Sequence, residues 1–159
     1  MQPVRYDPNY DLVPAFPGMI ADSGFSDTVT IACGPTPQPF GTVVGEDTAT
    51  GRSVFPITNP KGVALHDHNY AGRVGGVDGY TQFDAMSVAQ RRRVWGLASG
   101  TCSKDQVAKY NPANGTFSDA GTATMPNAKF LSANIACVGV RPGEAAAQMV
   151  LVELHSPTV

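Results

Sequence analysis

The stretch QMVLVEL, residues 148–154, is the clearest strand signal in this chain and decides its fold class. Its apolar residues occupy both faces of an extended strand, with Met149 and Leu151 on one and Val150, Val152 and Leu154 on the other. Apolar side chains on both faces indicate a central strand, or one that is covered on both sides.

Short apolar runs separated by Gly, Pro and Asn turns precede this stretch. The expected strands are TVTIA (28–32), FGTVV (40–44), SVFPI (53–57), GVALHD (62–67), DQVAKYN (105–111) and AKFLSANIACVGV (128–140). Because no convincing helix longer than two turns emerges, the pattern predicts an all-β fold, a small barrel or sandwich.

The segment FDAMSVAQRRRVWGLAS, residues 83–99, is ambiguous. It fits a helix capped by Asp84, or two strands that meet at the arginines. Gly96 in a helix interior costs roughly 1 kcal/mol. We therefore expect a β-hairpin with the arginines at its tip.

Residues 1–27 read as an extended N-terminal arm that leads into a β domain over residues 28–159. Prolines fix the backbone of the arm and remove hydrogen-bond donors, so it cannot build a core alone. Its large apolar residues need a surface, either their own domain or another subunit. The candidate contact residues are Tyr6, Tyr10, Leu12, Phe16, Met19 and Ile20.

The composition points to a partner-covered surface. Charged residues make up 15% of the chain, against roughly 25% in an average domain. The formal net charge of −2 predicts no attraction to nucleic acid or membranes. No leader pattern or bilayer-length apolar run is visible, so we expect synthesis in the cytosol.

The sequence offers few candidates for chemistry. In the run His66-Asp67-His68, the two histidines would lie on one face of a strand, as two metal ligands can. A third ligand is not evident, and a solvated strand end is the preferred interpretation. The three cysteines, Cys33, Cys102 and Cys137, are interpreted as free thiols. We expect no catalytic residues, no metal and no cofactor.

The run Arg91, Arg92 and Arg93 is a candidate contact with a phosphate or with an acidic partner surface, or else a solvated hairpin tip. Three adjacent side chains of a strand alternate between faces, so they do not form one patch.

Several pieces in order resemble tailed-phage capsid decoration proteins, also called structural cement proteins. The pieces are FPGMIAD, FGTVV, GVALHD, YTQFDAMSVAQRRRVWGLAS, DQVAKYNPANGTFS, NAKFLSANI and MVLVEL. This sequence has arginines where a family member often has a hairpin glycine before Val94-Trp95.

The resemblance implies a β-tulip domain, usually trimeric and sometimes dimeric, on the outside of a mature phage head. It implies the major capsid protein as the partner, an N-terminal arm that lies along the capsid, and no catalytic residues.

Three other readings stay open. A phage spike, fibre or carbohydrate-binding β module would need an aromatic platform, for which Tyr70, Tyr80 and Trp95 are candidates. A carrier domain would need an exposed lysine at a hairpin tip, with Lys61 the loose candidate. A metal hydrolase would be built on His66 and His68.

Overall fold

The computed structural model describes residues 17–21, 27–67, 69, 79–136 and 147–155. The strands in this part of the chain are β1 (Asp27–Ala32), β2 (Gln38–Pro39), β3 (Val43–Gly45), β4 (Pro60–Ala64), β5 (Gly79–Tyr80), β6 (Ala85–Ala98), β7 (Val107–Tyr110), β8 (Ala123–Phe130), β9 (Ile135–Ala136) and β10 (Gln148–Leu154). The expectation of an all-β fold is confirmed. None of the described segments contains a helix long and apolar enough to span a bilayer.

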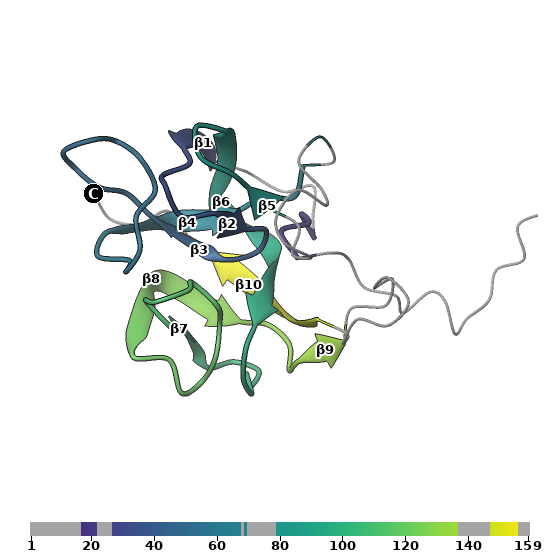
Figure 1. Cartoon of the computed structure of the whole chain (residues 1–159). Helices are drawn as coiled ribbons and strands as arrows, with labels where there is room; N and C mark the ends of the chain where they lie inside the picture. The colour runs from purple at the N-terminus through teal and green to yellow at the C-terminus, as the bar shows by residue number, and fades with distance from the viewer. Residues whose placement is uncertain (1–16, 22–26, 68, 70–78, 137–146, 156–159) are drawn as a thin grey trace, which may run out of the picture.

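Strand β6 is the long element that joins the two halves of the molecule (Figure 1). Its first half pairs with β1 on one edge and with β4 on the other, and its second half pairs with β10. The main sheet has the order β3-β4-β6-β10-β8-β7, while β2 and β5 form a separate small sheet. One strand thus ties the N-terminal strands to the C-terminal ones.

Strand β10 occupies the central position that its two-faced pattern predicts. It lies antiparallel between β6 and β8, and β9 also pairs with it. Val150, Val152 and Leu154 enter the larger core cluster, whereas Met149 is fully buried outside that cluster. Because one strand serves both faces, its apolar residues are needed at nearly every position.

Two core clusters fill the interior. The larger is built around Phe117 and Phe130, whose rings meet edge to face with centroids 6.0 Å apart. The smaller is built around Phe40 and Tyr80, whose rings also meet edge to face at 5.1 Å. Such aromatic pairs favour this geometry because the edge of one ring meets the negative face of the other.

The expected hairpin over residues 83–99 is wrong, because β6 is one continuous strand. Backbone pairing continues through the arginines: Arg91 is opposite Asp27 of β1, and Arg92 and Arg93 are opposite Leu154 and Glu153 of β10. The pairing keeps the backbone extended where three like charges suggested a turn.

Other boundaries differ from the expectation as well. The stretch 53–57 is not a strand, since only Ser53 forms an isolated bridge. The stretch 128–140 is interrupted after Phe130, where Leu131 turns to donate its N–H to Leu151. Residues 137–140 lie outside the described part of the chain.

Candidate functional site

The short segment at residues 17–21 is hydrogen-bonded to β6 on the edge opposite β10. Gly18 and Ala21 donate their N–H groups to the carbonyls of Trp95 (2.6 Å) and Arg93 (2.9 Å), and Trp95 donates to Met19 (3.0 Å). Ile20 forms an isolated bridge with Val94. This segment therefore extends the sheet by a short antiparallel strand.

A glycine is required at position 18 of this segment. Its φ of +81° is a backbone conformation that residues with a side chain rarely adopt. A Cβ there would also lie 2.6 Å from His66 N and 2.7 Å from Ala64 O. The Gly18 carbonyl also accepts the N–H of His66 at 2.9 Å. The turn at Pro17-Gly18 is thus an anchor point for the chain that enters the domain.

The structure divides the predicted arm residues into two groups. Ile20 is half-buried and packs against the larger core, while the Met19 side chain is 46% exposed. Tyr6, Tyr10, Leu12 and Phe16 lie outside the described residues. The anchored end of the arm is therefore held by its own domain, with Met19 facing outward.

The three arginines alternate between faces, as expected for a strand. Arg91 and Arg93 are exposed, while Arg92 is half-buried and its Nε has no hydrogen-bond partner among the described residues. The run therefore places the charged side chains of Arg91 and Arg93 on the outward face, whereas the side chain of Arg92 lies on the inner face.

A row of charges crosses three neighbouring strands on the outward face. Glu153 of β10 lies 3.7 Å from Arg93 of β6, 3.8 Å from Lys129 of β8 and 3.8 Å from His155. These pairs are largely solvated and contribute little to stability. One carboxylate faces three basic side chains, so the row carries an excess of positive charge.

A shallow groove of about 420 Å³ adjoins this row at a break in the β7–β8 pairing. Val107 pairs with Lys129 and Lys109 with Thr124, so β8 carries extra residues between these positions. Asn127, with φ 52°, makes the bend. Such bulges re-aim side chains and are common next to functional sites.

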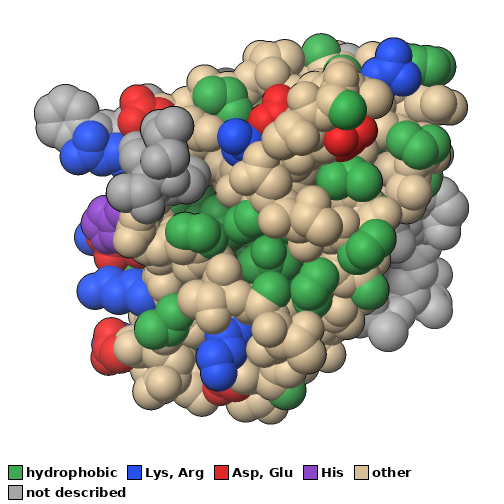
Figure 2. Space-filling view, turned by 90° about the vertical axis from the view of Figure 1, so that its left-hand side faces the viewer, with side chains coloured by type: hydrophobic (Ala, Val, Ile, Leu, Met, Phe, Trp, Pro, Cys, Tyr) green, Lys and Arg blue, Asp and Glu red, His purple; other side chains and the backbone are tan. Residues whose placement is uncertain are grey.

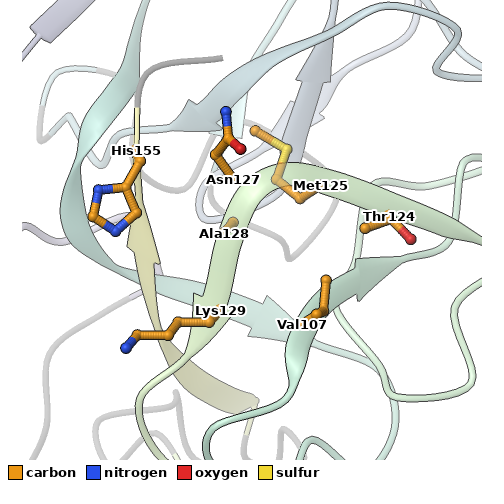
Figure 3. Close-up of a pocket in the computed structure, with 7 residues that line it drawn as sticks. All are labelled: Val107, Thr124, Met125, Asn127, Ala128, Lys129 and His155. Carbon is orange, nitrogen blue, oxygen red and sulfur yellow. The ribbon is translucent and has the colours of Figure 1, made fainter. Parts of the chain in front are cut away.

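Figure 3 shows the side chains that line the groove, drawn from β7, β8 and the residue after β10. They are Val107, Thr124, Met125, Asn127, Ala128, Lys129 and His155. The space-filling view shows apolar side chains across the middle of one face, with a histidine and basic and acidic groups at its margin (Figure 2). The sequence pattern did not reveal the groove, because the residues that line it come together only when β7, β8 and β10 pair. The available signal was the Pro126-Asn127 pair, since a proline inside a strand indicates an edge or a bulge.

The candidates for chemistry that the structure describes, His66, Cys33 and Cys102, do not form a site with one another. His66 packs its ring against Phe40 with centroids 4.7 Å apart, and His68 lies outside the described residues. Within the described ranges, no group of three or more His, Cys, Asp or Glu side chains is arranged to hold a metal ion. Cys33 and Cys102 are buried free thiols, and burial raises the pKa of Cys102 to about 12.

The aromatic platform expected of a carbohydrate-binding module lacks one of its members. Tyr80 is fully buried, and its hydroxyl donates to the Leu65 carbonyl at 2.8 Å. Trp95 is half-buried on β6, and Tyr70 lies outside the described residues. Tyr80 therefore serves the core and cannot contact a sugar.

Comparisons with known proteins match this architecture. A family model described as "Structural cement protein (E217 gp24/Pam3 gp6)" matches residues 5–155. A chain in the solved structure titled "The capsid of Myoviridae Phage XM1" is similar in fold, with a TM-score of 0.63 and 14% identity, over 90% of this chain and 91% of that one. No curated protein matches.

Proposed function

This chain belongs to the structural cement protein family, and we propose that it binds the outer surface of a mature phage head and bridges neighbouring subunits of the major capsid protein. Family membership makes it a capsid decoration protein of the virion, one that stabilises the shell, and implies a structural rather than an enzymatic role. The observation that carries the proposal is the extent of the match, since residues 5–155 include most of the N-terminal arm as well as the β domain.

The arm, residues 1–27, supplies the first contact in this proposal, and the β domain, residues 28–159, supplies the body that sits on the shell. The hydrogen bonds that join Gly18, Met19 and Ala21 to β6 support it, because they fix the point at which the arm is attached to the domain. The sixteen residues before this point would span at most about 55 Å if fully extended, which sets the outer limit of their reach.

The composition of the arm suits binding in an extended form. Its prolines restrict the free chain, so less conformational entropy is lost when it becomes ordered on a partner. The side chains proposed to contact the capsid are Tyr6, Tyr10, Leu12, Phe16, Met19 and Ile20, with Ile20 also serving the protein's own core. Aromatic residues are the usual anchors of such contacts.

The row of charges around Glu153, together with the exposed Arg91 beside it on β6, supplies a second contact. Arg91 and Arg93 are exposed on β6, and Lys129 lies nearby on β8. A surface with a basic excess steers and aligns an acidic partner more than it adds affinity. Arg92 faces inward and is a weaker candidate for this role.

Attachment at several points explains how modest contacts hold a shell under pressure from packaged DNA. Once one copy of an oligomer is bound, the others bind at a high effective concentration. We therefore propose a homo-oligomer, a trimer with a β-tulip domain, with a dimer as the second choice. Synthesis in the host cytoplasm precedes attachment.

The test is to mix the purified protein with expanded heads that lack it and to image the particles. Density at local threefold positions on the outer surface is the expected result, and heads that stay bare would refute the function. Removal of residues 1–16 should reduce occupancy strongly. Phe16→Ala and Met19→Ala should weaken binding more than Arg93→Ala, and the reverse order would move the contact to the charged row, of which Arg93 is a member.

A phage spike, fibre or carbohydrate-binding module is the second candidate. The buried position of Tyr80 argues against its aromatic platform. Binding to a glycan array without binding to heads would favour it.

A further inference from the structure

Phe83 is the most exposed large hydrophobic residue in the described part of the chain, and its backbone is unusual. Its side chain is 65% exposed, against 55% for Val107 and 46% for Met19. Its φ is 72°, in the left-handed region that a bulky side chain rarely adopts. A glycine or asparagine would satisfy this backbone at lower cost. The backbone conformation therefore gives no reason for an aromatic residue at this position.

The turn that carries Phe83 is held firmly. The Asp84 carboxylate accepts the backbone N–H of Thr81 at 2.8 Å and its hydroxyl at 2.9 Å, and Asp84 N donates to Thr81 O at 3.0 Å. Phe83 N donates to the Cys33 carbonyl at 3.0 Å, and Cys33 N donates to Asp84 O at 2.8 Å. The aromatic ring is thus presented from a rigid base, which limits the entropy lost on binding.

A second loop brings Arg52 onto the same ring. The Arg52 guanidinium carbon lies 5.0 Å from the centroid of Phe83, the geometry of a cation–π contact. The Arg52 carbonyl accepts the N–H of Asp47 at 2.9 Å, and its backbone forms a bridge with Ala32. Two exposed side chains from separate loops are therefore fixed against each other at the surface.

We infer that Phe83 and Arg52 form a binding knob for the capsid. In this contact the Phe83 ring enters an apolar pocket on the major capsid protein, and Arg52 pairs with a carboxylate at the rim of that pocket. The inference rests on the proposed function and adds a third contact, apart from the arm and the charged row. Aromatic residues and arginine are the side chains most enriched among energetically dominant interface residues.

The chemistry of the pair supports a partner pocket of this kind. The ring is apolar and largely solvent-exposed in the free protein, so its burial would release water from apolar surface. The guanidinium presents a flat, bidentate donor that matches a carboxylate, and it can stay stacked on the ring while it pairs.

The decisive variant is Phe83→Gly, because it separates the effect of the Phe83 side chain on the stability of the fold from its effect on binding to heads. We expect a melting temperature equal to or above that of the wild type, since the strained backbone is relieved. We expect binding to heads to fall by about tenfold or more, the loss typical of an interface anchor. Phe83→Asn, which also tolerates this backbone, should behave the same way.

Two further variants test the same contact: a control on the turn that carries Phe83, and a substitution of Arg52, which stacks on the Phe83 ring. Gln82→Ala, an exposed neighbour on the turn, should change neither stability nor binding. Arg52→Lys keeps the charge but loses the planar stack, and should reduce binding by an intermediate factor.

Each outcome decides the inference. If wild-type protein does not bind heads, the proposed function fails and the knob with it. If wild type binds and Phe83→Gly binds equally, only the knob is refuted. A marked fall in the melting temperature of Phe83→Gly would show a structural role and overturn the inference. If Phe83→Gly changes the mass of the oligomer but leaves attachment to heads unchanged, the knob contacts a second copy of this chain. That result would overturn the inference that its partner is the major capsid protein.

Discussion

Removing the anchored segment should cost stability, whereas removing the residues before it should not. Two truncations separate these effects: one deletes residues 1–16, and the other deletes residues 1–24. The second also removes residues 17–21, which are hydrogen-bonded to β6 and to His66. The comparison tests whether the arm is a free binding element or a part of the fold.

The magnitude follows from the bonds that are lost. Four backbone hydrogen bonds join this segment to the domain: Gly18 to Trp95 and to His66, Met19 to Trp95, and Ala21 to Arg93. Each contributes about 0.5–1.5 kcal/mol net. Because the freed groups of β6 partly rehydrate, we expect a total loss of about 2–4 kcal/mol, including the burial of Ile20.

The assay is urea denaturation of the full-length protein and both truncations. With a slope of about 2 kcal/mol/M, the longer deletion should lower the midpoint by about 1–2 M, while the deletion of residues 1–16 should leave it unchanged. The longer deletion should still give a soluble, folded domain. Equal midpoints for both truncations would show that the segment does not stabilise the domain, and the reasoning would fail.

Three further predictions test the core. Gly96→Ala should destabilise the protein by about 1–3 kcal/mol, because a Cβ there would lie 2.5 Å from the Phe117 ring; an unchanged thermal melt would contradict this packing. Tyr80→Phe should cost about 1–2 kcal/mol, since the buried Leu65 carbonyl loses its donor at 2.8 Å, and chemical denaturation measures the loss. Burial raises the pKa of Cys102 to about 12, so at pH 8 far less of this thiol is ionised in the folded state than in the unfolded state. Alkylation mapped by mass spectrometry should therefore modify Cys102 slowly until urea is added, and stability should fall as pH rises from about 9 toward about 12, because the unfolded thiol ionises first. Rapid native labelling would contradict that burial.

The local pattern of the sequence was sufficient for the strands whose side chains alternate or fill both faces. Residues 28–32 and 148–154 form strands close to where the pattern placed them. The central position of β10 followed from apolar residues on both faces, since only a strand with two covered faces can bury them. The alternation of Arg91 to Arg93 between faces also followed from the two-residue period.

The sequence could not predict features that depend on partners distant in the chain. A hairpin was predicted over residues 83–99, because the three arginines suggested a turn and Gly96 argued against a helix. Pairing with β1, β4 and β10 instead keeps residues 85–98 extended as one strand. Gly96 is needed there because the Phe117 ring occupies the space of a side chain. That contact involves residues far apart in sequence, and local propensity contains no information about it.

The sequence by itself determined the fold class, the proline-rich arm and, through the order of its short motifs, the family. Only the tertiary structure decided where the arm is anchored, that Tyr80 belongs to the core, and that Phe83 and Arg52 meet at the surface. The physical reason is range. Alternation and turn chemistry act between neighbouring residues, whereas strand register and the meeting of separate loops are set by the packing of the whole chain.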